Sequence, residues 1–187
     1  MPVKFADFIR FLRMKLINLF PAYHMKHEVT IVLDRLRSAY NTGNIFRIAD
    51  AIAAKEIICC GYTPFPPHPK LAKTAMGAEQ IISSRHFETS SHAVRQLRSE
   101  GIKQILAVET GLESVCAWKK KYEFPLALVF GNEALGILPE TIPLCDGIVG
   151  LPMFGFKSSI NVGNCAAVVL YSVVAKVMEQ KNNQLGQ

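Results

Sequence analysis

Apolar positions recur with two different periods along this chain, and these periods predict alternating strands and helices. Short apolar runs rich in β-branched residues predict strands at 28–33, 56–60, 103–108, 126–130 and 147–151, with a further short strand at 80–83. Apolar residues at helical spacing predict helices at 43–54, 70–76, 91–100 and 161–179. Because strands and helices alternate, we expect an α/β fold with a mostly parallel sheet flanked by helices.

The N-terminal part of the chain has a pattern of its own. Large apolar residues recur at helical spacing from Phe5 to Phe20, and Pro21 ends the pattern. We favour docking of this apolar stripe on the main domain over contact with RNA or a membrane, because so many large apolar groups need a partner. The expected segments are a basic amphipathic helical extension over 1–27, a main domain over 28–179 and a frayed polar tail over 180–187.

Charge points to an anionic partner without identifying it. The 187 residues include 21 Lys+Arg and 15 Asp+Glu, which gives a formal net charge of +6. Five Lys or Arg and one Asp lie in residues 1–27, so most of the excess is at that end. A basic chain with a basic end is typical of nucleic-acid binding but also of simple solubility.

Other classes of protein are disfavoured by what the sequence lacks. The longest uninterrupted apolar run, 165–171, is shorter than a membrane span, and residues 1–20 carry charges unlike a signal peptide. The five cysteines show no C-x-x-C spacing and the five histidines no H-E-x-x-H pattern. We therefore expect no membrane span, no disulfide framework and no metal site, and a location in the reducing cytoplasm.

Three polar segments follow predicted strands, where parallel sheets bind their ligands. The first, S-A-Y-N-T-G-N-I-F-R over 38–47, suggests a helix capped by Asn41 or Thr42, with a phosphate-binding start and Arg47 one turn further on. The second, V-F-G-N-E-A-L-G over 129–136, flanks Glu133 with two glycines but is neither a P-loop nor a dinucleotide fingerprint. The third, over 149–164, enters the last helix through Ser159 and Asn161. A plain structural role remains open for each segment alone.

Taken together and in this order, the three segments resemble the signature motifs of the SpoU/TrmH family of SPOUT RNA methyltransferases. The resemblance covers about residues 28–175. It implies an α/β sheet with a deep C-terminal trefoil knot, a homodimer, and S-adenosylmethionine as the cofactor, with no metal. The implied reaction is methyl transfer to a ribose 2′-hydroxyl of structured RNA. Transfer RNA is favoured over ribosomal RNA, because no separate RNA-binding domain is recognisable.

The resemblance also assigns roles to residues. It implies a catalytic group in which Arg47 acts near the target phosphate and hydroxyl, with support from Asn41, Glu133, Ser159 and Asn161. The implied cofactor-binding residues are Val108, Glu109, Gly131, Leu151, Met153 and Ile160. The candidate RNA contacts outside the resemblance are Arg10, Arg13 and Lys15. An arginine is a poor base because its guanidinium stays protonated, so the identity of the base is open.

The sequence departs from the family pattern near the last helix. Ile160 stands where the family usually has leucine, and Gly163 and Asn164 stand where it commonly has a serine. Two weak helix formers at this point suggest selection for close packing rather than helix propensity. A non-catalytic RNA-binding relative with the same fold is the main alternative, and a membrane-surface protein acting through residues 1–20 is a third.

Overall fold

The computed structural model of the protein describes residues 27–111 and 113–185. Apart from His27, the expected N-terminal extension lies outside the described residues, together with Arg10, Arg13 and Lys15. Within the described residues the fold is α/β, as the alternating pattern predicts.

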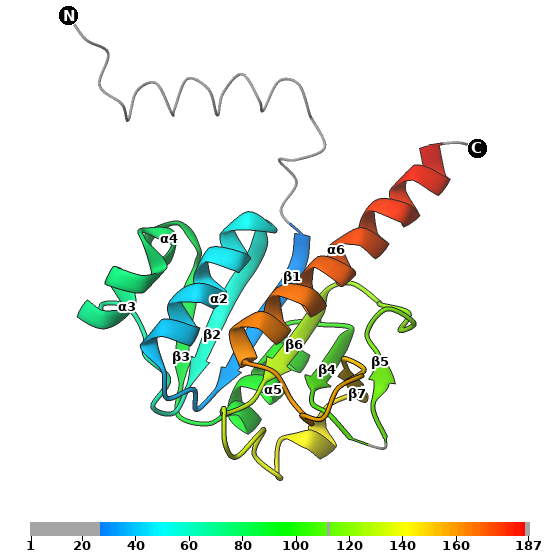
Figure 1. The fold of residues 1–187 in the computed structure, drawn as a ribbon. Helices are drawn as coiled ribbons and strands as arrows, with labels where there is room; N and C mark the ends of the chain where they lie inside the picture. The colour runs from blue at the N-terminus through cyan, green and yellow to red at the C-terminus, as the bar shows by residue number, and fades with distance from the viewer. Residues whose placement is uncertain (1–26, 112, 186–187) are drawn as a thin grey trace, which may run out of the picture.

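A seven-stranded sheet, in which every pair of strands is parallel, forms the centre of the fold (Figure 1). Its strands are β1 (His27–Asp34), β2 (Ala54–Cys60), β3 (Ser84–Phe87), β4 (Gln104–Val108), β5 (Val115–Cys116), β6 (Leu126–Phe130) and β7 (Ile148–Gly150). The order across the sheet is β3-β2-β1-β6-β4-β7-β5. Strand β6 therefore joins the β1 side of the sheet to the β4 side.

Helices cover both faces of the sheet. They are α2 (Ala39–Ala51), α3 (Pro69–Ala75), α4 (Ala78–Ile81), α5 (Ser90–Ser99) and α6 (Val162–Leu185), with a short 3-10 helix, η2 (Ile142–Leu144). Buried residues of α2, α3, α4 and α6 pack in one hydrophobic cluster with the strands, and those of α5 pack in a second cluster. The result is a layer of helices on each side of the sheet, as parallel strands require.

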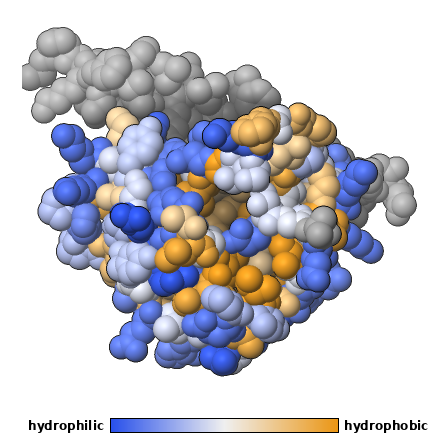
Figure 2. All heavy atoms as spheres, turned by 60° about the horizontal axis from the view of Figure 1, so that its bottom comes forward, coloured by the Kyte–Doolittle hydropathy of each residue, from blue (hydrophilic) through white to orange (hydrophobic). Residues whose placement is uncertain are grey.

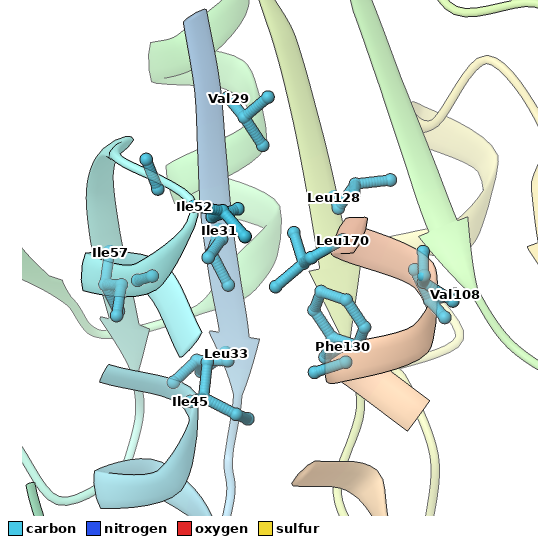
Figure 3. Close-up of a cluster of buried hydrophobic side chains, with 14 of the residues drawn as sticks. Val29, Ile31, Leu33, Ile45, Ile52, Ile57, Val108, Leu128, Phe130 and Leu170 are labelled. Carbon is cyan, nitrogen blue, oxygen red and sulfur yellow. The ribbon is translucent and has the colours of Figure 1, made fainter. Parts of the chain in front are cut away.

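Successive side chains of β1 point to opposite faces of the sheet, so they pack against different layers of helices. Ile31 and Leu33 belong to the cluster beneath α2 and α6, and Val32 belongs to the cluster beneath α5. Figure 3 shows Ile45 of α2 and Leu170 of α6 among the strand residues of the first cluster. Each such side chain contributes about 1.5–3 kcal/mol when it is fully buried.

The predicted bounds of two elements in the N-terminal half of the chain are wrong. Helix α2 begins at Ala39 rather than at residue 43, and its cap is Ser38, whose side chain accepts a hydrogen bond from Asn41 N, rather than Asn41 or Thr42. The first two residues of the strand expected at 80–83 belong to the short helix α4, and the strand begins only at Ser84. The reason is local, because Gly77 has a φ of 92° and its N–H donates to Glu79, which starts a helical turn.

The C-terminal helix also differs from expectation. The tail expected to fray from residue 180 is helical as far as Leu185. Among the described residues, one segment, Val162–Glu179 of α6, is long and apolar enough to cross a membrane by length and composition alone. The stripe formed by Ala166, Val169, Leu170 and Val173 is buried against the sheet, as in the core helix of an α/β protein.

Candidate functional site

A cavity of about 300 Å³ lies where the carboxyl ends of β4, β6 and β7 meet the start of α6. Figure 2 looks towards this edge of the sheet and shows apolar side chains gathered around a hollow. The cavity is lined by residues after three strands and before one helix: Val108, Glu109, Thr110, Phe130, Gly131, Asn132, Glu133, Ala134, Gly136, Gly150, Leu151, Met153, Ser158, Ser159, Ile160, Asn161, Val162 and Cys165. Its volume is at the small end of the range for ligand pockets.

Glu133 connects the loop after β6 to the start of α2. Its carboxylate accepts hydrogen bonds from the backbone N–H of Arg37 at 3.0 Å and of Ser38 at 3.2 Å. It also accepts from Asn41 Nδ2 at 2.8 Å. Partial burial raises the pKa of this carboxyl, but the hydrogen bonds from Arg37, Asn41 and Ser38 outweigh it and hold the pKa below its ordinary value. Glu133 is therefore charged and fully engaged near neutral pH, which makes it a poor general base.

Asn41 and Asn161 extend this chain of hydrogen bonds to α6. Asn161 Nδ2 donates to Asn41 Oδ1 at 3.0 Å. The Oδ1 atom of Asn161 accepts from the N–H groups of Gly163 at 2.9 Å and Asn164 at 3.3 Å, so its side chain caps the helix. One continuous network thus joins the three polar segments that the sequence places far apart.

Close packing explains the glycines of the site. A Cβ on Gly131 or on Gly136 would lie 2.9 Å or 2.7 Å from Glu109 Oε1. That same oxygen accepts a hydrogen bond from Ile137 N at 2.8 Å, so Glu109 holds the loop after β6 in place. A Cβ on Gly163 would lie 2.6 Å from Asn44 Nδ2 of α2. The packing partner of this unusual helix start is therefore a helix of the same chain.

The cavity is electrostatically unlike the protein as a whole. Two carboxylates, Glu109 and Glu133, line it, and its described lining contains no lysine or arginine. The formal charge of the chain is nevertheless +6. Such a lining suits a ligand with a cationic centre and an apolar part, and it disfavours a bare phosphate.

The structure brings most of the candidate residues together. All six expected cofactor-binding residues line the cavity, as do Glu133, Ser159 and Asn161, and Asn41 is one hydrogen bond behind them. Arg47 lies apart, exposed on α2 and outside the described lining of the cavity. Because α2 begins at Ala39, Arg47 is more than two helical turns from its start, rather than the one turn expected.

The expected phosphate site at the start of α2 is also wrong. The N–H groups of Arg37 and Ser38 donate to Glu133, and that of Asn41 donates to Ser38 Oγ. A carboxylate of the same chain therefore occupies the place where an anion was expected, and it would repel a second negative charge.

Two supporting residues were not singled out from the sequence. Asp34 is fully buried at the end of β1 and accepts a hydrogen bond from Leu138 N at 2.7 Å, which fixes the far end of the loop after β6. Asn132 is 4% exposed, and its Oδ1 accepts from Ala134 N and Leu135 N. A polar residue directly after a buried apolar run was the available signal for both.

Known proteins share both the sequence pattern and the fold. The profile of the SpoU rRNA methylase family matches residues 28–171. A tRNA (guanosine(18)-2'-O)-methyltransferase of Escherichia coli (strain K12) is 28% identical over 144 residues, which are 77% of this chain and 62% of that protein. A 23S rRNA (uridine(2479)-2'-O)-methyltransferase of Streptomyces viridochromogenes is 30% identical over 148 residues, which are 77% of this chain and 51% of that protein. The chain thus spans between 51% and 62% of the length of these two relatives.

Solved structures agree with the sequence comparison. The crystal structure of the SpoU methyltransferase AviRb from Streptomyces viridochromogenes in complex with AdoMet has a TM-score of 0.73 and 25% identity, covering 83% of this chain and 60% of that one. The A. aeolicus TrmH/SpoU tRNA modifying enzyme has a TM-score of 0.75, covers 90% of this chain and 85% of that one, and at 21% identity supports the fold alone. With the family profile matched over nearly all of the described domain, and with the parallel fold these structures share, the chain belongs to the SpoU rRNA methylase family.

Proposed function

We propose that the protein is an S-adenosylmethionine-dependent methyltransferase that modifies a ribose 2′-hydroxyl of RNA. The observation that carries this proposal is that the second and third signature segments line one partly apolar cavity with two carboxylates, while Asn41 of the first segment is hydrogen-bonded to both of these segments. The relatives named above act on the 2′-O position of transfer or ribosomal RNA, and one structural neighbour was crystallised with AdoMet. Transfer RNA stays our prediction for the substrate, with ribosomal RNA as the alternative.

The cavity fits the expected cofactor. S-adenosylmethionine has a positively charged sulfonium, an apolar methylene chain and polar ends, and it supplies the methyl group that is transferred. Apolar side chains of Val108, Leu151 and Ile160 and the carboxylates of Glu109 and Glu133 line the same space. Gly131 and Gly150 also line this space, and both are buried against neighbouring backbone, where a larger residue would not fit.

The residues of the chain would then act mainly by positioning. A sugar hydroxyl is a weak nucleophile, so it must be oriented and must lose its proton as it reacts. We assign to Arg47 the alignment of the RNA phosphate and hydroxyl, because its exposed guanidinium is free of any hydrogen bond within the described residues. We assign to Glu133, Asn41 and Asn161 the task of holding α2 against the cavity.

We extend the proposal to assembly and location. The side chains of Val168, Tyr171 and Met178 are exposed on α6, and those of Phe154 and Phe156 are almost fully exposed in the loop before it. So much apolar surface beside the cavity supports a homodimer in which a second copy covers α6. All five cysteines are free, which supports a cytoplasmic location. The trefoil knot implied by the resemblance likewise stays a prediction.

Substitution of Arg47 tests the catalytic proposal. We expect Arg47→Ala to lower methyl transfer to RNA by about 10²-fold or more while S-adenosylmethionine binding and the thermal unfolding temperature remain unchanged. The measurement is transfer of labelled methyl groups to RNA from a strain that lacks the gene, with calorimetric titration of the cofactor. The control is Arg95→Ala, which removes another exposed arginine, on α5 at the opposite face of the sheet, and should be fully active.

The same experiments separate the alternatives. Wild-type turnover in the Arg47→Ala protein would remove Arg47 from the mechanism. Failure of the wild-type protein to bind S-adenosylmethionine, together with no loss of 2′-O-methyl nucleotides in the deletion strain, would favour a non-catalytic RNA-binding protein. Mapping of those nucleotides in both transfer and ribosomal RNA would identify the substrate.

A further inference from the structure

An exposed aromatic ring stands beside the cavity and takes no part in the contacts described so far. Tyr62 lies two residues after β2, at the edge of the sheet where the cavity opens. Its side chain is 55% exposed. A solvent-exposed tyrosine is unremarkable by itself, so the argument depends on how rigidly this ring is held and what surrounds it.

The backbone around Tyr62 is fixed on both sides. Gly61 N donates to Phe87 O at 2.9 Å. Thr63 is 3% exposed, and its hydroxyl contacts the carbonyl oxygens of Leu33 at 3.1 Å and Cys60 at 2.8 Å and accepts from Leu36 N at 2.9 Å. Tyr62 is therefore the exposed residue between two anchored neighbours, and little conformational entropy remains to be lost when its ring is covered.

The ring is also fixed at its far end. Asn132 Nδ2 donates to the Tyr62 hydroxyl at 3.0 Å and to Arg35 O at 2.7 Å. Asn132 is 4% exposed and lines the cavity, so this hydrogen bond ties the ring to the cavity wall. Tyr62 itself is not among the residues that line the cavity. The ring thus stands at the rim, next to the cofactor space but outside it.

The segment tied to the ring through Asn132 carries two arginines, one of them without an ionic partner in the described residues. The Arg35 carbonyl shares the Asn132 amide with Tyr62, and the exposed Arg37 lies two residues further along the same segment. The guanidinium of Arg35 is engaged by Asp34 and by the carbonyl of Gly136, whereas the side chain of Arg37 points to solvent. An exposed aromatic ring, with a solvent-exposed arginine on the segment that shares its Asn132 contact, matches the chemistry of an unpaired nucleotide, which presents a flat base and a phosphate.

We infer that Tyr62 is a stacking platform for an unpaired RNA base next to the nucleotide that is methylated. The inference rests on the proposed function, since it assigns to the rim of that site a contact with its RNA substrate. Sequence-specific proteins bind single-stranded RNA by stacking bases on aromatic rings, and alanine substitution of one such ring weakens binding by about 1–3 kcal/mol per base. For this protein we therefore expect a loss of about tenfold or more in affinity for base-bearing RNA.

Three fluorescent oligomers of about 12 nucleotides provide the test: oligoadenylate, oligouridylate and an abasic ribose-phosphate chain of the same charge. Their binding is followed by fluorescence anisotropy at one fixed low salt concentration, because phosphate contacts depend strongly on salt. We expect Tyr62→Ala to weaken oligoadenylate binding about tenfold or more, oligouridylate binding less, and abasic binding not at all. Tyr62→Phe keeps the ring and loses only the hydroxyl, so it should bind all three within about twofold of wild type.

The control is another exposed aromatic residue. Trp118 is 47% exposed and follows β5, at the opposite end of the sheet from the β2 strand that precedes Tyr62. Trp118→Ala should bind all three oligomers as the wild type does. Thermal unfolding of every variant shows whether the fold is retained. If Tyr62→Ala is unstable, a large loss of oligoadenylate binding in a folded Tyr62→Phe protein, which keeps the ring, would still overturn the inference.

Four further results would overturn the inference: no measurable binding of base-bearing oligomers by the wild type, wild-type affinity in Tyr62→Ala, an equal loss with the abasic chain, or a loss of S-adenosylmethionine affinity instead of RNA affinity. Calorimetry of cofactor binding and methyl transfer to RNA by the wild type are measured in parallel. Their failure would remove the proposed function, whereas an active wild type with an unaffected Tyr62→Ala variant would remove only the stacking role.

Discussion

At the scale of single residues, Glu133 organises the site through its acceptor oxygens. Its carboxylate receives two backbone N–H groups from the segment before α2 and the amide of Asn41. Those N–H groups would otherwise have no partner inside a helix. An acid from the loop after β6 thus completes the start of a helix that follows β1, which couples the two halves of the site.

Replacing this carboxyl by an amide tests that coupling. We expect Glu133→Gln to lower the free energy of unfolding by about 1 kcal/mol near neutral pH, because one of the two acceptor oxygens becomes an amino group that faces N–H donors. Methyl transfer should fall as well, because α2 is no longer held against the cavity. Denaturant unfolding and transfer assays measure the two effects, with Glu140→Gln, an exposed carboxyl beyond the same loop, as the control.

Acidification should remove the contribution of Glu133 to the free energy of unfolding. The pKa of Glu133 is lower in the folded protein than its ordinary value of 4.5, so its contribution to stability is complete above that value. It is lost as the pH falls through the lowered folded pKa, where the carboxyl becomes protonated in both states. The stability difference between wild type and Glu133→Gln should therefore shrink below pH 4.5. A difference that stays constant down to strongly acidic pH would contradict the assignment.

At the scale of elements, the glycines of the site are sites of close packing between helices. A Cβ on Gly43 of α2 would lie 2.7 Å from Thr74 Cβ and 2.8 Å from the backbone N of Ala75 in α3. At Gly163 of α6 the nearest atom is the amide nitrogen of Asn44, at the end of a side chain that can move. The contact of α2 with α3 is thus rigid, and the contact of α2 with α6 is adaptable.

Alanine substitutions should separate these two contacts. Within a helix, glycine to alanine normally stabilises by about 1 kcal/mol, but Gly43→Ala should destabilise the protein by about 1–3 kcal/mol because α3 must shift. Gly163→Ala should have a smaller effect. Thermal unfolding measures both, and Gly155→Ala, whose Cβ would meet nothing within 4 Å, is the control. A stabilised Gly43→Ala protein would show that α3 moves away at little cost.

Individual strands and helices differ in how well the sequence predicts them. The long central strands were predictable because β6 is a continuous apolar run and the middle of β1, from Val29 to Leu33, is interrupted by Thr30 alone, as suits strands buried on both faces. The start of α2 was not, because the acid that completes it comes from a loop nearly a hundred positions away. Strand β5 has only Val115 and Cys116, too short for any periodicity. The site residues came from the order of three motifs, whereas their hydrogen bonds depend on the fold.

At the scale of the whole molecule, the two most exposed of the large apolar side chains in the described residues lie in the loop before α6. Phe154 is 91% and Phe156 100% exposed, and both precede α6. Tyr171 is 54% exposed on α6 itself. A stable interface buries about 800 Å² on each partner, and large exposed apolar side chains are the kind of group that such contacts cover.

A charge placed on this surface should separate the two copies. We expect the wild-type protein to sediment as a dimer and Tyr171→Asp to sediment as a monomer, because an unpaired carboxylate is costly to bury in an apolar interface. Trp118→Asp, at an exposed ring beyond β5, should remain dimeric. Sedimentation equilibrium measures the masses. A monomeric wild type, or a dimeric Tyr171→Asp protein, would exclude α6 as the interface.

The position of β6 in the sheet also bears on when the cavity forms during folding. This strand fills the gap between β1 and β4, and Val29 pairs with Leu126 across most of the domain's length. Contacts between such distant positions form slowly, since a long loop must close before they contribute. The cavity lies directly beyond this junction and also needs the start of α6, so we expect it to form late in folding. A ligand that binds there binds only folded molecules, so it should slow unfolding and raise the apparent stability with the logarithm of its concentration once that concentration exceeds the Kd.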